Sequence, residues 1–443
     1  MRSSKTLLFS LLTILGAVTG VFVFAGKLIQ KDVEYNALSA STTRQVVGNA
    51  SATSAALSPL TQAAKPVPPV THLRTPTPVR AAYMTSCIAS GRKLRAPLVE
   101  FVENTEINAL VIDIKDFSGM VSIDTGDSRF VLNTHGCNVP DIQAFIASLH
   151  DKGIYIIGRV TVMQDQVYTK SHPDAAVKRK SDGETWHDRK GLAFVDPGAA
   201  EYWQYMIDLG KASYAIGFDE VNYDYIRYPS DGDMANAMFT RTGSTTKAEM
   251  MKRFYAALGS GMHEAKIPIS ADLFGMTTTN TDDLGIGQVL ENALINFDYV
   301  APMVYPSHYP PYFNGWKNPN LVPYEVVKYA MTHAATRADM LEQKESGFVA
   351  TVSTTTTRDG KVATTTSKFT PTGIYAKKLR PWIQDFNYGK VYSEADVRAQ
   401  MKAVYDSGLD SWMMWDPKNV YTKNAYDSAK PANVGTIATS STI

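Results

Sequence analysis

The chain has 443 residues, enough for one large domain or two to three small ones, and its 44% hydrophobic and 20% charged residues are typical of a globular protein with a sizeable core. Its formal net charge of +1, without a basic run interleaved with aromatic residues, gives no reason to expect a nucleic acid as partner.

The first segment predicts membrane insertion. Arg2 and Lys5 precede Thr6–Ile29, in which the first charge is Lys27. About 20 apolar residues can cross a bilayer as a helix, and positive residues before them favour a cytoplasmic N-terminus. We therefore expect a cytoplasmic start and signal-anchor at 1–31, and a single-pass protein of the cell membrane with its body on the extracytoplasmic side. A cleaved signal peptide, which would release a secreted protein, is the alternative.

The next segment, 32–78, is rich in Ala, Ser, Thr and Pro and poor in large apolar side chains. This composition cannot bury enough apolar surface to fold by itself. It therefore predicts a disordered spacer that holds the body away from the membrane.

The chain has two cysteines, Cys87 and Cys137. Two thiols are too few for a disulfide framework, and no neighbouring histidine has the spacing of a zinc ligand. In an exported protein they form either one disulfide bond or two small buried thiols, and the sequence leaves both open.

From residue 79 onward, short apolar runs alternate with amphipathic segments of helical period. The eight runs that predict strands are 79–85, 109–115, 154–160, 216–224, 267–275, 299–306, 379–386 and 411–417. A strand and a helix repeated eight times predict an α/β fold, the (β/α)8 TIM barrel, over 79–430. A doubly wound sheet is the alternative, but no Gly-rich phosphate loop follows the first strand. A flexible tail is expected at 431–443.

One segment between the sixth and seventh predicted strands falls outside this repeat. Residues 347–373 are Thr-rich, with Thr and Val alternating around RDGK. The alternation predicts a β-hairpin on a surface excursion, while the low complexity is equally typical of a mobile tract. No catalytic role is expected of it.

The stretch GFDEVNYDYIRYPSD (217–231) places Asp219, Glu220 and Asp224 in a predicted strand. An unpaired buried charge costs several kcal/mol, so these acids need an explanation. In a barrel, successive side chains alternate between the interior and the surrounding helices. If Val221 and Tyr223 face the helices, Glu220, Asn222 and Asp224 face inward and rise towards the C-terminal mouth, where barrel enzymes carry their active sites.

The same alternation brings polar and aromatic side chains to that mouth from other strands. They are Asp113, Lys115 and Asp116 on the second, Arg159 on the third, Ser270 and Asp272 on the fifth, Met303 and Tyr305 on the sixth, Trp382, Gln384 and Asp385 on the seventh, and Trp412, Trp415 and Asp416 on the eighth. A cup of carboxylates with an aromatic rim is typical of sugar chemistry. Cleavage of a glycosidic bond needs one carboxylic acid to protonate the leaving oxygen and one carboxylate to attack or to activate water.

We therefore predict Asp224 as nucleophile or base and Asp272 as general acid, with Glu220 in reserve. The residues predicted to orient these carboxylates are Lys115, Arg159 and Arg227, and those predicted to hold sugar rings are Tyr305, Trp382 and Trp415. Asp113, Asp116, Asn222 and Asp416 complete the predicted substrate-binding set. The competing interpretation is that the acids only form ion pairs inside the barrel. No metal and no cofactor are expected, because no His-x-x-x-His or His-x-His occurs at the strand ends.

Several motifs resemble a known family in order along the chain. They are GFDEVNYDYIRYPSDG, FVDPG, APMVYPSHY with GWKNPNLVPYEVV, and LRPWIQDFNYG. Together they resemble a bacterial family of glycoside hydrolase-like barrels long catalogued as a domain of unknown function, over about Val79 to Asn424. The resemblance implies a barrel related to carbohydrate-active enzymes.

Fainter similarities extend to two other groups of barrels. Met303 and Tyr305 match chitinase-like barrels, but Tyr225 stands near the place of their catalytic Glu. Asp224 and Asp272 fit the alpha-amylase-like arrangement better. The expected function is a glycoside hydrolase acting on an extracellular or cell-surface polysaccharide or oligosaccharide, and the alternative is a non-catalytic carbohydrate-binding or cell-wall-associated module.

Overall fold

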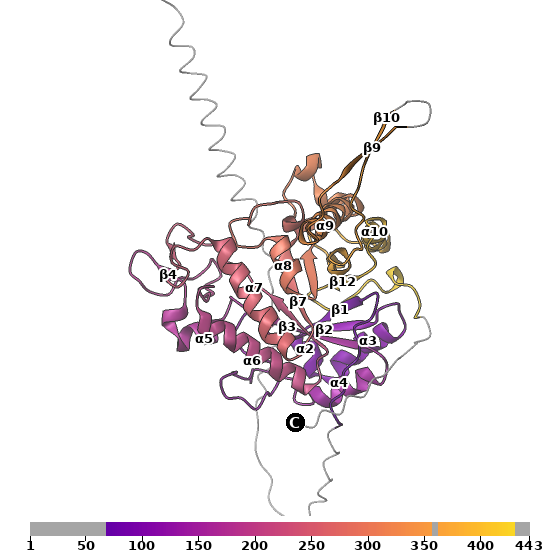
Figure 1. Ribbon diagram of the computed structural model, residues 1–443. Coiled ribbons are helices and arrows are strands. Elements are labelled where there is room, and N and C mark those ends of the chain that lie inside the picture. Colours follow the sequence, from indigo (N-terminus) through magenta and orange to yellow (C-terminus); the bar gives the residue numbers. More distant parts are fainter. Residues whose placement is uncertain (1–67, 357–361, 430–443) are drawn as a thin grey trace, which may run out of the picture.

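The computed structural model describes residues 68–356 and 362–429 (Figure 1). Its centre is a closed barrel of eight parallel strands, in the order β1-β12-β11-β8-β7-β5-β3-β2. The strands are β1 (Arg80–Met84), β2 (Ala109–Lys115), β3 (Tyr155–Thr161), β5 (Glu220–Asp224), β7 (Ile269–Phe274), β8 (Tyr299–Met303), β11 (Trp382–Gln384) and β12 (Trp412–Trp415). Each of the eight predicted strands overlaps one of these, so the predicted (β/α)8 barrel is confirmed.

Helices follow the strands and surround the barrel (Figure 1). They are α2 (Ser86–Ser90), α3 (Arg92–Glu103), α4 (Ile142–His150), α5 (Gln166–Ser171), α6 (Ala200–Ile216), α7 (Lys247–Glu264), α8 (Leu290–Asn296), α9 (Pro323–Glu345) and α10 (Glu394–Asp406). At the end of α6, Gly217 has a φ of 127°, which favours glycine and turns the chain towards β5.

Two apolar cores follow from the alternation along the strands. On β3, Ile156 and Val160 pack outward against the helices, whereas Tyr155 and Ile157 join the interior of the barrel. Position 158 also faces the helices, and it is occupied by glycine because a Cβ there would lie 2.2 Å from Ile114 Cδ1. The interior core is small and aromatic, which leaves the polar side chains of the same strands to fill the rest of the lumen.

The Thr-rich segment forms the predicted hairpin. The strands β9 (Val352–Thr356) and β10 (Val362–Thr366) pair antiparallel, and Figure 1 shows them projecting from the barrel. A second small sheet pairs β4 (Lys178–Arg179) with β6 (Ala237–Met238). The sequence pattern did not predict it, because two-residue strands carry no alternation.

The end of the predicted spacer is not a free linker. Residues 68–78, here called the strap, run along α4 and then pack across the N-terminal end of the barrel. The backbone N–H of Leu73 donates to Asp219 Oδ1 at 2.7 Å, and the hydroxyls of Thr75 and Tyr155 lie 3.0 Å apart. His72 stacks on Tyr214, with ring centroids 3.8 Å apart. The spacer prediction is therefore corrected for the strap.

The predicted signal-anchor at 1–31, most of the spacer, and the tail at 431–443 lie outside the described residues. In the part of the chain that is described, no helix combines the length and the apolar character that crossing a membrane requires.

Candidate active site

A single guanidinium joins two carboxylates inside the mouth of the barrel. Arg159 on β3 donates from Nη1 to Asp113 Oδ1 at 2.7 Å, and to Asp224 Oδ2 from Nη2 at 2.5 Å and from Nε at 3.2 Å. Both pairs are shielded from solvent, with the three side chains at most 7% exposed. Asp113 also accepts the hydroxyl of Tyr83 on β1. The neighbouring strands β1, β2, β3 and β5 therefore meet through this arginine, here called the arginine clamp.

Asp272 stands on β7, beside β5, and is held by neutral donors. Its Oδ1 accepts from Asn222 Nδ2 at 2.9 Å and from Trp382 Nε1 at 2.8 Å. The β5–β7 register pairs Tyr223 with Ala271, so Asp224 and Asp272 are the next residues along their strands. Paired strands lie about 4.8 Å apart, which makes the two acids neighbours in the lumen.

The protonation of this group follows from burial and charge. Burial raises the pKa of Asp272 well above its ordinary value, and the nearby charge of Asp224 raises it further. Burial also raises the pKa of Asp113, against the lowering effect of Arg159. Three carboxyls face one guanidinium, so full ionisation would leave two negative charges uncompensated away from water. The arrangement favours a proton on Asp272.

Aromatic rings stand beside the clamp. Trp415 on β12 stacks on Tyr83 with centroids 3.9 Å apart, and the Arg159 guanidinium carbon lies 5.2 Å from the Trp415 ring centroid. Trp382 meets the Trp415 ring edge to face at 5.2 Å. Tyr305, predicted to hold a sugar ring, belongs to the same interior core. The predicted aromatic side chains are thus brought together with the carboxylates.

Trp382 does not have the predicted role of holding a sugar ring. Its side chain is completely buried, so its face is not open to a sugar ring. Its indole N–H instead fixes Asp272. Trp412, the other tryptophan of β12 that the sequence offered, points outward into the helix-facing core, since Met413 and Trp415 occupy the inward places.

Lys115 does not reach the carboxylate cup. The β2–β3 register shifts between Asp113 and Lys115, so Lys115 leaves the inward phase that Asp113 keeps. Its ammonium forms a buried ion pair with Asp165 at 3.0 Å and donates to the carbonyl of Thr161 at 2.6 Å. It therefore ties β2 to the end of β3, and the prediction that it orients the catalytic carboxylates is corrected.

Glu220 points inward as predicted, but at the wrong height. It lies four residues before Asp224, about 13 Å lower at 3.3 Å per residue. Its carboxylate accepts from Arg380 Nη2 at 2.6 Å and from the Tyr155 hydroxyl at 3.2 Å, and the side chain is fully buried. Glu220 is thus part of the closed bottom of the barrel, and its place as reserve acid is corrected.

Arg227 is also separated from the acids. It donates to the Tyr228 carbonyl at 3.1 Å and the Ser230 hydroxyl at 3.2 Å, and its guanidinium carbon lies 4.6 Å from the Phe274 ring centroid. Among the residues described, none of its hydrogen bonds or ion pairs is with a carboxylate. It shapes the loop after β5 instead of orienting the carboxylates.

The two rim acids are engaged with their own loops. Asp116 accepts from the backbone N–H of Ser118 at 2.8 Å, and Asp416 accepts from that of Lys418 at 2.6 Å. Burial raises the pKa of Asp416 to about 6. Both follow the strand ends as predicted, while their contact with a substrate stays a prediction.

Sequence reasoning missed Tyr83 and Arg380. Tyr83 sits between Ala82 and Met84 on β1, and its alternation with them was a usable signal for the interior. Arg380 precedes β11 by two residues, and no local pattern indicates that it pairs with Glu220, 160 positions away. Among the described residues, no group of three or more His, Cys, Asp or Glu side chains is placed to hold a metal ion.

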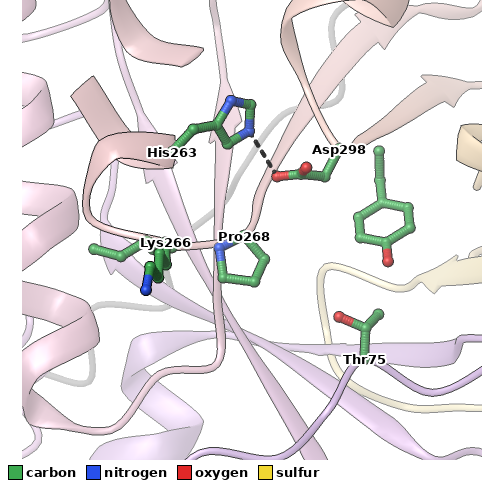
Figure 2. A pocket seen from close by; sticks show the side chains of 7 residues that line it. Thr75, His263, Lys266, Pro268 and Asp298 are labelled. Carbon is green, nitrogen blue, oxygen red and sulfur yellow. Dashed lines mark hydrogen bonds and ion pairs between the residues drawn. The ribbon is translucent and has the colours of Figure 1, made fainter. Parts of the chain in front are cut away.

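A cavity of about 260 Å³ opens at the opposite end of the barrel (Figure 2). His263 Nε2 and Asp298 Oδ2 lie 3.0 Å apart on its wall, with Lys266 and Thr75 among the other lining residues. It adjoins the starts of β7 and β8. Barrel enzymes carry their sites at the C-terminal end of the strands, where the arginine clamp and Asp272 lie and this cavity does not.

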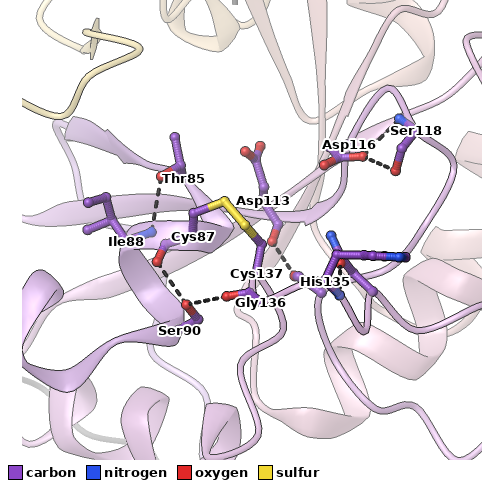
Figure 3. Close-up of a disulfide and its surroundings, with 12 residues drawn as sticks. Thr85, Cys87, Ile88, Ser90, Asp113, Asp116, Ser118, His135, Gly136 and Cys137 are labelled. Atoms are coloured by element: carbon purple, nitrogen blue, oxygen red, sulfur yellow. Dashed lines mark hydrogen bonds between the residues drawn. A yellow bond between two sulfur atoms is a disulfide. The ribbon is translucent and has the colours of Figure 1, made fainter. Parts of the chain in front are cut away.

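A disulfide bond joins the helix α2 to a loop on the mouth side. Cys87 at the start of α2 is bonded to Cys137 in the segment between β2 and α4 (Figure 3). The Ser90 hydroxyl lies within hydrogen-bond distance of the carbonyls of both Cys87 and Gly136, which holds the helix and the loop together beside the bond. Of the two possibilities that the sequence left open, the structure has the disulfide.

A family model described as "Putative glycosyl hydrolase domain" matches residues 81–362 and 350–421. No curated protein matches the chain. Among solved structures, a hypothetical protein from Ruminiclostridium thermocellum is 27% identical and covers 46% of this chain and 98% of its own, with a TM-score of 0.38. The PgaB (BpsB) glycoside hydrolase domain from Bordetella bronchiseptica is 11% identical, covers 79% of this chain and 94% of its own, and has a TM-score of 0.49. A chitinase from Chromobacterium violaceum is 12% identical, covers 79% of this chain and 97% of its own, and has a TM-score of 0.41.

Proposed function

This chain belongs to the family described as "Putative glycosyl hydrolase domain", and from that premise we propose that it hydrolyses glycosidic bonds of a polysaccharide with Asp272 as general acid and Asp224 as base or nucleophile. One observation carries the proposal. Two acids on adjacent strands have opposite environments, because Asp224 accepts three N–H groups, two of them from Arg159, whereas only neutral donors hold Asp272. Acid/base cleavage of a glycoside requires two carboxyl groups whose environments favour different protonation states, one protonated and one ionised.

The surroundings support this division of roles. Burial and the charge of Asp224 raise the pKa of Asp272, which favours the protonated form that can donate to the leaving oxygen. Asn222 Oδ1 is buried without a hydrogen-bond partner in the described part of the chain. A buried acceptor is usually paired in a native protein, so a bridging water would complete this amide.

We also propose that the barrel works outside the cytoplasm. The Cys87–Cys137 disulfide supports this, because such bonds persist mainly in oxidising compartments. The apolar run at 6–29 supports export with an anchor or a cleaved signal. The substrate would then be an extracellular or cell-surface polysaccharide.

A specific observation favours a second candidate, a non-catalytic carbohydrate-binding module. Asp113 and Asp224 are 5% exposed and Asp272 is 1% exposed, and two of the three are clamped by Arg159. A general acid has to reach the glycosidic oxygen. If these carboxylates stay shielded when a glycan is bound, the protein can bind the glycan but cannot cleave it.

The test is the release of reducing ends from a polysaccharide panel by the full chain. Asp272→Asn and Asp224→Asn should each lower kcat by about a hundredfold to ten-thousandfold, the usual contribution of one acid or base group. Asp410→Asn, at an exposed position before β12, is the matched control and should keep wild-type rates. Equal rates in all four proteins would remove both acids from the mechanism. Tight binding of a glycan without release of reducing ends would favour the binding module.

A further inference from the structure

The residue after Asp224 has an unusual backbone conformation. Tyr225 has a φ of 53°, in the left-handed region, where the Cβ of any residue other than glycine crowds its own backbone. In the described part of the chain, the other non-glycine residues with positive φ are Lys266, Leu284, Tyr312, Asn314 and Asn419. Of this set, Tyr225 alone directly follows a residue of the proposed catalytic pair. A large side chain adopts this conformation only where the surrounding contacts hold it.

The chain is fixed on both sides of this residue. The carbonyl of Asp224 accepts from the backbone N–H of Val162 at 2.9 Å. The carbonyl of Tyr225 accepts from the backbone N–H of Met163 at 3.2 Å. The next residue, Ile226, is fully buried and belongs to the helix-facing core. The strand β5 thus ends at Asp224, and the left-handed turn at Tyr225 returns the chain to the core.

The same turn places a backbone donor against the proposed base. The N–H of Tyr225 donates to Asp224 Oδ1 at 2.6 Å. Arg159 binds the other oxygen, Oδ2, from Nη2 at 2.5 Å. The two oxygens of this carboxylate are therefore held separately, one by the backbone and one by a charged side chain. A carboxylate held in this way has little freedom to rotate about its Cβ–Cγ bond.

The sign of φ at Tyr225 decides whether this hydrogen bond forms. The carbonyl of Tyr225 and the buried side chain of Ile226 are fixed, so a change to negative φ has to rotate the peptide unit between Asp224 and Tyr225. A peptide unit is planar, so its N–H rotates with it, away from Asp224 Oδ1. The strained backbone of Tyr225 and the orientation of the Asp224 carboxylate are therefore linked.

We propose that Tyr225 is a positioning residue, whose left-handed backbone holds the Asp224 carboxylate in the orientation that glycosidic cleavage needs. This inference rests on the proposed function and adds to it a residue that acts through its backbone. Misplacing a reacting group by about 1 Å can cost a hundredfold in rate. We therefore expect the loss of this hydrogen bond to lower kcat while KM stays the same.

The test compares three replacements at position 225 that differ in their tolerance of positive φ. Glycine adopts it without strain, asparagine tolerates it, and the β-branched valine tolerates it least. All three lose the phenol ring together with every contact that the ring makes, so the comparison between them isolates the backbone. Tyr225→Val should have a kcat about tenfold to a hundredfold below those of Tyr225→Gly and Tyr225→Asn, with a similar KM in all three.

Lys266 provides a matched control away from the mouth. It has a φ of 57° and is exposed between α7 and β7, where it lines the cavity at the opposite end of the barrel. Lys266→Val should unfold at a lower temperature than Lys266→Gly, while both keep the kcat of the wild type. If Lys266→Val lost as much kcat as Tyr225→Val, strain would act on activity only through stability, and the proposal would be overturned.

A milder replacement covers the case in which Tyr225→Val does not fold. Alanine keeps a Cβ but is not branched, so it disfavours positive φ less than valine does. The kcat of Tyr225→Ala should lie about threefold to tenfold below that of Tyr225→Gly, again with a similar KM. Equal kcat in these two proteins would overturn the proposal.

The hydrogen bond itself is tested independently of any glycan. In the full chain labelled at the tyrosine nitrogen, the amide signal that disappears in Tyr225→Phe identifies residue 225. An N–H that donates to a carboxylate forms a short, strong hydrogen bond, which moves its proton signal to low field. Asp224→Asn should move this signal to higher field. A signal that stays in place in Asp224→Asn would overturn the proposal.

The outcomes separate this inference from the proposed function. Equal kcat in Tyr225→Val and Tyr225→Gly, with Asp224→Asn inactive, overturns the role of Tyr225 and leaves the hydrolase standing. A kcat that falls in Tyr225→Val and recovers in Tyr225→Gly and Tyr225→Asn supports both. If none of the proteins, wild type included, releases reducing ends, both are overturned.

Discussion

Replacing Arg159 by Met tests whether the arginine clamp compensates the buried acids. Arg159 is 5% exposed and pairs with Asp113 and Asp224, which are equally buried. Removing one partner of a buried ion pair leaves an uncompensated charge and costs about 3–5 kcal/mol. The free energy of unfolding from urea denaturation should fall by that amount near neutral pH. Arg253→Met, which breaks an exposed pair with Glu249, is the matched control and should cost only about 0.3–0.5 kcal/mol.

The pH dependence gives this prediction its sign. Arg159 lowers the pKa of Asp113 against the rise that burial causes, so its loss raises that pKa further. An acid with a raised pKa in the folded state loses stability as the pH rises through that pKa. The deficit of Arg159→Met should therefore shrink as the solution is acidified, and adding Asp113→Asn and Asp224→Asn should restore most of the stability at neutral pH. A loss no larger than that of Arg253→Met would refute the reasoning.

Three further perturbations follow from the same contacts. Trp382→Phe removes a donor that lowers the pKa of Asp272, so the pH at which kcat falls on the alkaline side should move upward. An alkaline fall of kcat at the same pH in wild type and variant would contradict this. Asp416→Asn removes an acid whose pKa burial raises to about 6. The free energy of unfolding of the wild type should therefore fall by about 1–3 kcal/mol relative to that of the variant as the pH rises from about 4 to 7. The same pH dependence of unfolding in both proteins would contradict this. Cys87→Ser with Cys137→Ser opens a bridge across a sequence separation of 50 and should cost about 2–4 kcal/mol; the idea fails if a reductant leaves the unfolding temperature of the wild type unchanged.

Alternation along the strands was sufficient to predict which acids converge. Once eight strand-helix repeats indicate a barrel, the inward phase of each strand follows from its apolar residues. Asp113, Arg159, Asn222, Asp224 and Asp272 were all placed in this way, and their hydrogen bonds form two neighbouring groups, Asp113–Arg159–Asp224 and Asn222–Asp272. The pattern works because a one-residue slip would expose an entire apolar set.

The inward or outward phase of a residue does not determine how far along the barrel axis its side chain lies, nor where a strand is irregular. Glu220 has the right phase, but its pairing with Arg380 depends on contacts across the bottom of the barrel. Lys115 leaves the inward phase because of a register shift after Asp113, and no residue type announces that shift. Trp382 shows a third limit, since a side chain large enough to stack on a sugar can instead be buried as the donor that fixes an acid.

Asp219, the first acid of the GFDEVNYD stretch, has its consequence at the other pole of the barrel. Its Oδ1 accepts from the backbone of Leu73, and its Oδ2 accepts from Ile156 N at 2.8 Å and lies 3.0 Å from His150 Nε2. The strap is thereby fastened to the pole away from the mouth. From there towards Pro68 the strap follows α4, where Thr71 Oγ1 lies 3.1 Å from His150 Nδ1 and the carbonyl of Pro68 accepts from Gln143 Nε2 at 2.9 Å. An acid that the sequence brings close to the cup thus stabilises the opposite pole, through contacts with the strap, α4 and β3.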